Sequence, residues 1–255
     1  MTAERKHVIV SGTYSTGKTT TSTALSIYTG IPLINALSAR EILLDLYPGR
    51  AFQQMSVTEL LALGLKRFEE RVSAESELRH GMFISDGSVL NEWIYGTVRM
   101  KVGINPGAPW PQQLYKAMRG ILHKGFYKRY LDAYGTVVQR HAREAYDLAF
   151  HLPIEFAMDP DGHRPVSEKY RDISDVELRQ CMKDLRIPFH VVRGTLRERL
   201  ACMTEYLGVT PVVSTDDAVR DATDRVRNSH EALAKRIQDQ QGEGLRHRVS
   251  GMFRY

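Results

Sequence analysis

The stretch Val8–Thr21, VIVSGTYSTGKTTT, joins a run of β-branched residues to two glycines, a lysine and several threonines. Its central part, Gly12-x4-Gly17-Lys18-Thr19, has the spacing of a phosphate-binding loop. In such a loop the glycines let successive backbone N–H groups point at phosphate oxygens, and the N-terminus of the following helix adds a positive dipole. The stretch therefore predicts a nucleotide-binding loop between a buried strand over 7–11 and a helix over 18–29.

The hydroxyl and amino groups of this loop predict how it would bind a nucleotide. Lys18 reaches the β- and γ-phosphates, the Thr19 hydroxyl is a ligand of Mg²⁺, and Thr20 reaches the α-phosphate. Because no guanine-recognition motif stands out, we expect ATP and Mg²⁺ as cofactors. The residues expected to bind them are Gly12, Ser15, Thr16, Gly17, Lys18, Thr19 and Thr20.

The composition narrows the class of protein. The chain has 255 residues, 42% hydrophobic and 25% charged, with a formal charge of +5 that suits anionic ligands without implying nucleic acid. Its two cysteines, Cys181 and Cys202, have no metal-binding or disulfide spacing. No apolar run is long enough for a signal peptide or a membrane span. We expect a cytoplasmic protein without a membrane partner, and the sequence leaves open whether it forms a homo-oligomer.

Predicted strands alternate with predicted helices along most of the chain. This order favours an α/β fold, a parallel five-stranded sheet with helices on both faces. The expected P-loop domain covers residues 1–210, with a helical insertion at about 103–145, and a helical C-terminal extension covers 211–255. The predicted strands are 7–11, 32–35, 82–86, 147–153 and 189–192, and the predicted helices are 18–29, 39–47, 56–80, 88–101, 112–145, 173–186, 195–207 and 215–240.

An aspartate ends the third predicted strand. Carboxyl ends of parallel strands meet at one edge of the sheet, so Asp86 is expected beside the phosphate-binding loop. There it would hold Mg²⁺ or accept the proton of an attacking hydroxyl. The alternative is an N-cap for the helix that starts near Ser88.

The polar segment 159–172 contains three cations, Arg164, Lys169 and Arg171. Kinases of this architecture close a cationic lid over the transferred phosphoryl group, and we expect this role for Arg164 and Arg171. A solvated loop is the alternative.

Two further groups of residues have open interpretations. The basic residues of 116–143 do not all fall on one side of a helix, so a solvated face is favoured over a nucleic-acid surface. Trp93, Tyr95 and Trp110 are candidates for stacking on an acceptor base, with core packing as the alternative.

Four segments in a fixed order resemble a known family. The family is the nicotinamide riboside kinase-like domain of bifunctional bacterial NAD-biosynthesis regulators, with its related AAA-type ATPases. The segments, spread over about residues 6–207, are GTYSTGKTT from Gly12, SAREIL from Ser38, FISDGSVLNEWIYG from Phe83, and YDLAFHLPIEFAMDPDGHR from Tyr146 followed by VVRGTLRERL.

This resemblance implies roles for several residues. Arg40 and Glu41 would lie near the acceptor pocket, Arg164 would be a lid cation, and Arg197 or Arg199 would lie near the adenine. With Trp93 added as a substrate-binding aromatic, the expected function is ATP-dependent phosphorylation of a small hydroxyl-bearing molecule, a nucleoside or nucleotide. The alternatives are a regulatory ATPase, a resistance protein acting on a nucleoside-like compound, and a nucleic-acid-binding ATPase that uses segment 116–143.

Overall fold

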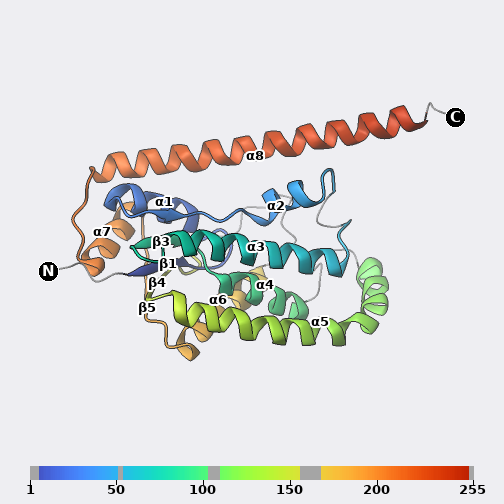
Figure 1. Cartoon of the computed structure of the whole chain (residues 1–255), viewed down its shortest axis with the longest axis horizontal. Helices are drawn as coiled ribbons and strands as arrows, with labels where there is room; N and C mark the ends of the chain where they lie inside the picture. Colours follow the sequence, from blue (N-terminus) through green and yellow to red (C-terminus); the bar gives the residue numbers. More distant parts are fainter. Residues whose placement is uncertain (1–5, 51–53, 103–109, 156–167, 253–255) are drawn as a thin grey trace.

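A computed structural model of the chain describes residues 6–50, 54–102, 110–155 and 168–252 (Figure 1). At residues 57, 110–124 and 241–252 it describes the backbone alone. Within the described residues, each helix is too short or too polar to cross a membrane.

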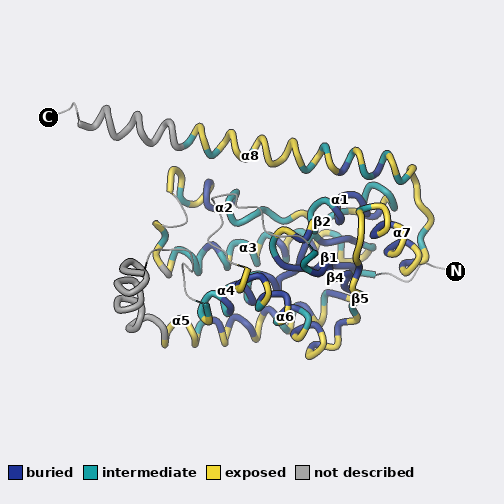
Figure 2. The backbone as a smooth tube through the Cα atoms, turned by 180° about the vertical axis from the view of Figure 1, so that it is seen from behind, coloured by how far each residue is buried: buried dark blue, intermediate teal, exposed yellow. Residues whose placement is uncertain are grey.

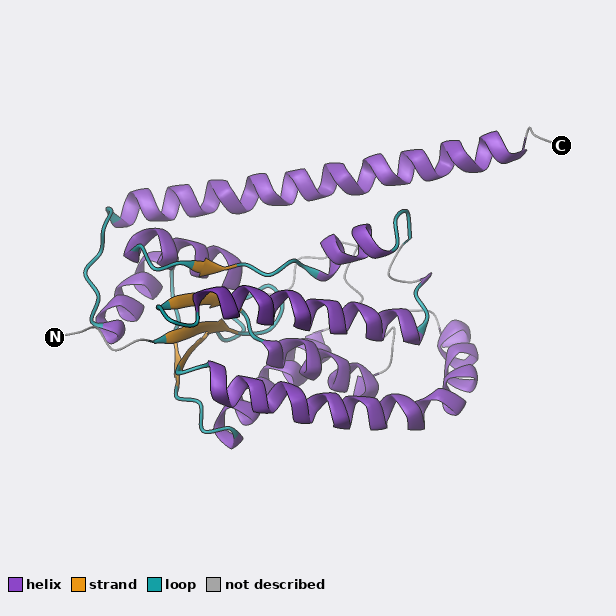
Figure 3. Cartoon of the chain, in the orientation of Figure 1, coloured by secondary structure: helices purple, strands orange, loops and turns teal. Residues whose placement is uncertain are grey.

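The five strands form one parallel sheet in the order β2-β3-β1-β4-β5 (Figure 3). This confirms the predicted α/β fold. Strand β1 is central and three of its residues, Val8, Ile9 and Val10, are fully buried, as a run of β-branched residues in a two-sided parallel sheet should be. The strands are β1 His7–Ser11, β2 Leu33–Ile34, β3 Phe83–Asp86, β4 Leu148–His151 and β5 Phe189–Val191.

Helices cover both faces of the sheet. Helices α1 and α7 and the start of α8 pack on one face, and α4, α5 and α6 pack on the other (Figure 1). The helices are α1 Lys18–Thr29, α2 Ala39–Leu46, α3 Val57–Leu78, α4 Val89–Val102, α5 Trp110–Ala145, α6 Glu168–Asp184, α7 Leu196–Leu207 and α8 Thr215–Met252.

Local sequence signals begin several of these helices where they were predicted. Ser38, Ser56 and Thr195 each accept a hydrogen bond from the backbone N–H three residues later, and the glutamate there bonds back to the cap. Such reciprocal capping satisfies backbone donors that a helix start leaves unpaired. The starts of α2, α3 and α7 therefore follow from short sequence motifs.

The predicted lid over residues 159–172 is wrong at its C-terminal end. Residues 168–172 form the first turn of α6, which begins at Glu168, an acidic residue in a first turn that favours helix formation. The guanidinium of Arg171 accordingly lies inside the protein and bonds the Glu168 carboxylate at 2.9 Å. The rest of the predicted lid, with Arg164, lies outside the described residues.

Helix α8 runs along the whole molecule, past α1 and then past α2 (Figures 1 and 2). Ala218 and Ala222 are fully buried where it packs against α1. Further along, Arg236 forms an ion pair with Asp45 of α2 at 3.2 Å. The helix predicted over 215–240, within the extension expected over 211–255, is therefore a packed helix in that range, and it bridges α1 and α2.

Ala222→Asp is expected to lower the free energy of unfolding by about 2–3 kcal/mol, because it buries a carboxylate against α1 without a partner. Urea denaturation followed by circular dichroism measures this loss. The control is Ala232→Asp, which places the same charge at an exposed position of α8. Equal losses in the two variants would contradict the packing of α8 on α1.

Candidate functional site

The phosphate-binding loop leaves the centre of the sheet after β1 and enters α1 at Lys18. Gly12 and Gly17 have φ angles of 147° and 83°, in the left-handed region that glycine tolerates. The Thr16 hydroxyl donates to the Thr13 carbonyl at 3.0 Å, and the Lys18 ammonium donates to the same carbonyl. The loop is thus wrapped on itself, with Lys18 folded over it.

Asp86 lies at the end of β3, beside the start of α1. Its Oδ2 atom accepts a hydrogen bond of 2.7 Å from the Thr19 hydroxyl. Its Oδ1 atom is buried and has no hydrogen-bond partner among the described residues. The predicted meeting of Asp86 with the loop is therefore present in the structure. Asp86 does not cap α4, because the Ser88 N–H and hydroxyl bond the Asn91 side chain instead.

A magnesium ion would suit this pair of side chains. Mg²⁺ prefers hard oxygen donors and usually takes only one or two from the protein, with the rest from phosphates and water. Thr19 and Asp86 supply such oxygens, and the unpartnered Oδ1 of Asp86 is a buried carboxylate atom that a cation would satisfy. Elsewhere in the described chain, no group of three or more His, Cys, Asp or Glu could hold a metal.

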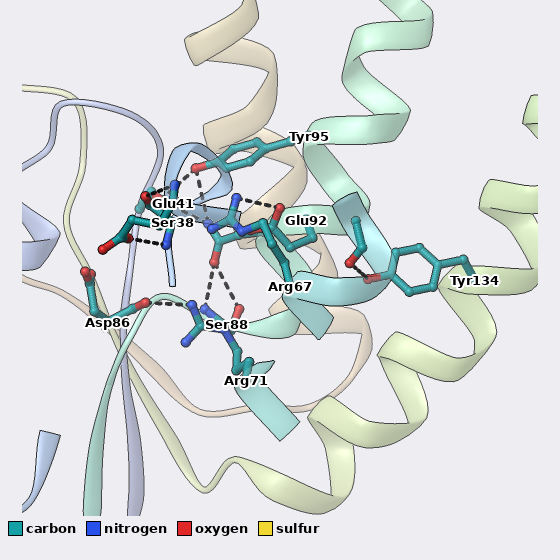
Figure 4. Close-up of polar contacts among 12 residues, drawn as sticks. Ser38, Glu41, Arg67, Arg71, Asp86, Ser88, Glu92, Tyr95 and Tyr134 are labelled. Atoms are coloured by element: carbon teal, nitrogen blue, oxygen red, sulfur yellow. Dashed lines mark hydrogen bonds and ion pairs between the residues drawn. The ribbon is translucent and has the colours of Figure 1, made fainter. Parts of the chain in front are cut away.

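Arg71 of α3 holds the end of β3 in place (Figure 4). The residue is only 5% exposed and donates to the Ser85 hydroxyl at 2.7 Å and to the Asp86 carbonyl at 3.0 Å. A weaker bond of 3.4 Å reaches the Gly87 carbonyl. Arg71 thus ties the Ser85 side chain and the carbonyls of Asp86 and Gly87 to a helix, and it sets where the Asp86 carboxylate projects.

Arg71→Met is expected to lower the free energy of unfolding by about 2–4 kcal/mol, because it leaves buried acceptors at the end of β3 without donors. Chemical denaturation measures the change. Arg79→Met, at the exposed end of the same helix, is the matched control and should cost less than about 0.5 kcal/mol. A loss confined to Arg79→Met, or absent from both, would contradict the anchoring role of Arg71.

A cavity of about 590 Å³ extends from the loop between α2, α3, α4 and α5. Arg40 and Glu41 line it, and the Glu41 carboxylate accepts the Ser38 N–H at 2.7 Å. Arg67 and Glu92 form an ion pair of 2.8 Å across it (Figure 4). Its remaining wall includes Tyr95, Arg99, Tyr127, Tyr130 and Tyr134, and the α8 residues Val226, Ser229, His230 and Leu233.

Tyr95 links this cavity to the loop. Its ring stacks on Tyr14 at 4.4 Å between centroids, and its hydroxyl accepts from the Asn91 amide at 3.3 Å. Burial raises the pKa of Tyr95, so the hydroxyl stays protonated. The Asn91 amide also donates to the Gly12 carbonyl at 3.2 Å. The first turns of α4 therefore support the loop from the cavity side.

Two predicted site residues lie away from the cavity wall. The Trp93 indole N–H donates to the Leu131 carbonyl at 2.9 Å, and its ring packs against Gly135, which is the core packing named as the alternative to stacking. Arg199 lies behind the loop and is 4% exposed. It donates to the Thr16 carbonyl at 3.0 Å and pairs with Glu155 at 2.7 Å. Arg199 thus supports the loop backbone.

Several residues that the fold brings to the cavity were not predicted from the sequence as site residues. Arg67 and Arg71 lie in a helix that carried no motif, and Glu92 and Asn91 were part of a quoted segment but had no assigned role. The sequence left the role of the C-terminal extension open, and the structure shows that α8 lines the cavity. The only available signal was the helical spacing of the less polar positions Ala222, Val226, Leu233 and Ile237, which predicts a packed face without naming its partner.

Comparison with known proteins supports the observed fold. No curated protein matches the chain in sequence. Among solved structures, deoxyadenosine kinase from M. mycoides with bound dATP is similar at 14% identity and a TM-score of 0.54, covering 80% of this chain and 100% of that one. The same enzyme with the products dCMP and dCDP is similar at 15% identity and a TM-score of 0.53, with coverages of 79% and 98%.

At this identity the similarity shows the fold alone, which this chain shares with that deoxyadenosine kinase. A family model described as an AAA domain matches residues 7–199, which contain the sheet, the loop and Asp86. The chain therefore belongs to the AAA domain family.

Proposed function

We propose that this protein transfers the terminal phosphoryl group of ATP to a hydroxyl of a small molecule. The observation that supports this most directly is the position of Asp86. Its carboxylate and the loop residues 14–20 line the same cavity of about 590 Å³, where Asp86 contacts Thr19 and has one buried oxygen unpartnered among the described residues. From the loop the cavity continues between α3, α4 and α5, which gives room for an acceptor beside the phosphates.

The donor would bind along the loop and the first turn of α1. Backbone N–H groups from Gly12 to Thr20 surround the phosphates, and Lys18 leaves the Thr13 carbonyl to reach the β- and γ-phosphates. Thr19 and Asp86 would hold Mg²⁺, which when bound neutralises charge on the β- and γ-phosphate oxygens. The donors are preorganised, because Arg199 and Asn91 hold the loop backbone from opposite sides.

The acceptor would occupy the cavity with its hydroxyl next to Asp86. The carboxylate is placed to take the proton of that hydroxyl as its oxygen attacks the γ-phosphorus in line with the leaving ADP. Arg71 positions Asp86 for this step through the backbone contacts described above. Arg164 is our proposed lid cation over the transferred group.

The substrate class we propose is a nucleoside or a nucleoside-like compound. A cavity of this volume is within the range of small-molecule sites, and its tyrosine rings offer flat apolar surfaces for a base. The sequence resemblance to nicotinamide riboside kinase-like domains and the fold shared with a deoxyadenosine kinase favour the same class. We propose that the acceptor site lies between α3, α4 and α5.

The test is ADP release from Mg·ATP across a panel of nucleosides and nucleotides that includes nicotinamide riboside. One acceptor is expected to raise turnover well above the rate without acceptor, and Lys18→Ala is expected to abolish the increase. Lys183→Ala, an exposed lysine at the end of α6, is the control and should leave it unchanged. ATP binding without stimulation by any acceptor would contradict the proposal and favour a regulatory ATPase that signals through α8, since α8 lines the same cavity.

A further inference from the structure

One face of α4 lines the cavity beyond the ion pair of Arg67 and Glu92. Its cavity-lining residues include Glu92, Tyr95, Gly96 and Arg99, which share one side of a helix by their spacing. Helix α5 faces them across the cavity with Tyr127, Tyr130 and Tyr134. A side chain at Gly96 would meet Leu131 at 2.9 Å, so glycine allows the two helices to approach closely here.

Arg99 is the cation at this end of the cavity that lacks a carboxylate partner among the described residues. Its neighbours are already paired, because Glu92 binds Arg67 at 2.8 Å and Lys101 binds Glu177 at 2.6 Å. Arg99 is itself half-buried and lines the cavity. A half-buried guanidinium loses part of its hydration, so an anion that enters the cavity would gain a strong interaction with it.

Two phenol hydroxyls on the α5 side of the cavity also lack partners among the described residues. The Tyr130 hydroxyl is buried and makes no hydrogen bond within the described residues. The Tyr127 hydroxyl lies close to Gly96 of α4, 3.6 Å from the position that a β-carbon would take there. Burial raises the pKa of Tyr127 and the pKa of Tyr130, so both hydroxyls keep their protons. At Tyr127 the positive charge of Arg99 opposes part of this rise in pKa. This end of the cavity therefore offers hydrogen-bond donors together with a positive charge.

The position of Arg99 along α4 determines how far its guanidinium lies from the acceptor hydroxyl that would react next to Asp86. Helix α4 begins at Val89, directly after the turn that follows Asp86. At a rise of about 1.5 Å per residue, Arg99 lies roughly 15 Å along the helix from Val89. Its side chain leans toward the helix N-terminus, so its guanidinium lies on the order of 10 Å from the transfer site.

We propose that the acceptor carries an anionic group, a carboxylate or a phosphate, at the end away from the reacting hydroxyl, and that Arg99 binds this group with the Tyr127 and Tyr130 hydroxyls. The inference rests on the proposed kinase function and adds the charge of the substrate to it. Neutral nucleosides leave Arg99 without a counter-ion, whereas an acceptor with such a group satisfies the guanidinium and both phenols.

Matched neutral and anionic acceptors test this inference. One series pairs adenosine, guanosine, cytidine and uridine with their 3′-monophosphates, and a second pairs nicotinamide riboside with its carboxylate counterpart, nicotinate riboside. The first series identifies phosphate as the anion and the second identifies carboxylate. We expect an anionic acceptor to exceed its neutral counterpart in kcat/KM by about 10- to 100-fold, the range of a hydrogen bond to a charged group.

Variants of Arg99 test whether this residue causes the preference for an anionic acceptor. Arg99→Gln is expected to remove the preference, so that an anionic acceptor and its neutral counterpart react with equal kcat/KM, whereas Arg99→Lys should retain part of it. Arg129→Gln removes the same charge at an exposed position of α5 and is the control that should preserve the preference.

Two results would overturn the inference in different ways. If a neutral acceptor is phosphorylated as well as its anionic partner and Arg99→Gln changes neither rate, the inference fails while the kinase function stands. If wild-type protein phosphorylates no compound of either series, the proposed function fails and the inference fails with it. The appearance of ADP with a neutral acceptor distinguishes the first failure from the second.

Discussion

Asp86→Asn is expected to lower kcat for phosphoryl transfer by about 100- to 1,000-fold, the usual effect of removing one electrostatic or proton-accepting group from an active site. The asparagine keeps the shape of the side chain and can still accept the bond from Thr19, so the fold should be retained. It loses the negative charge and the buried oxygen that would face Mg²⁺ and the acceptor hydroxyl. Steady-state kinetics with the best acceptor, together with a thermal melt, measures both effects.

The control for this variant is Asp184→Asn at an exposed position near the end of α6, which should leave kcat unchanged. The affinity for ATP should fall by less than about tenfold in Asp86→Asn, because Lys18 and the loop backbone still bind the phosphates. A normal kcat in Asp86→Asn would contradict the role proposed for this carboxylate. If the melting temperature of Asp86→Asn falls and its activity falls in proportion, Asp86 contributes to the stability of the fold and not to the chemical step.

Gly12→Ala is expected to lower the free energy of unfolding by more than about 3 kcal/mol, a large share of the roughly 5–15 kcal/mol that typical domains have. Two costs add here. The φ angle of 147° is strained for any L side chain, and a β-carbon would lie 2.7 Å from both the Leu152 carbonyl and the Thr16 hydroxyl. Because Leu152 follows β4, relief would require the loop and a neighbouring strand to separate.

Urea denaturation measures this cost, and the same substitution at Gly125 is its control. Gly125 lies within α5, and no described atom lies within 4 Å of the position that a β-carbon would take there. Alanine at this position should therefore stabilise the helix by about 0.5–1 kcal/mol. Any Gly12→Ala protein that remains folded should gain no stability from added Mg·ATP. A Gly12→Ala protein as stable as wild type would show that the loop adopts another conformation.

Much of the fold follows from local patterns in the sequence. The buried run at β1 and the glycine spacing after it act within a few residues, so the strand, the loop and the start of α1 at Lys18 were all predictable. Capping residues such as Ser38 have the same local character. The alternation of strands and helices then implied a parallel sheet, whose carboxyl edge brings Asp86 to the loop.

Burial and long-range partners were not predictable in the same way. Arg171 is a cation in a polar segment, which favours a lid, but the helix that begins at Glu168 turns its side chain into the protein. The resemblance implied Arg197 or Arg199 near the adenine, but it did not reveal that Arg199 is buried and bonds the Thr16 carbonyl of the loop. Trp93 fills space beside Gly135 rather than lining the cavity.

The sequence by itself determined the nucleotide-binding loop, the starts of the capped helices α2, α3 and α7, and the order of strands and helices, because each depends on backbone conformation and on neighbours close along the chain. Tertiary structure alone decided what surrounds the loop. It brought Arg71 to the carbonyl of Asp86, paired Arg67 with Glu92, and laid α8 along the cavity. These contacts join residues far apart in sequence, and their chemistry depends on how helices pack, which short motifs do not encode.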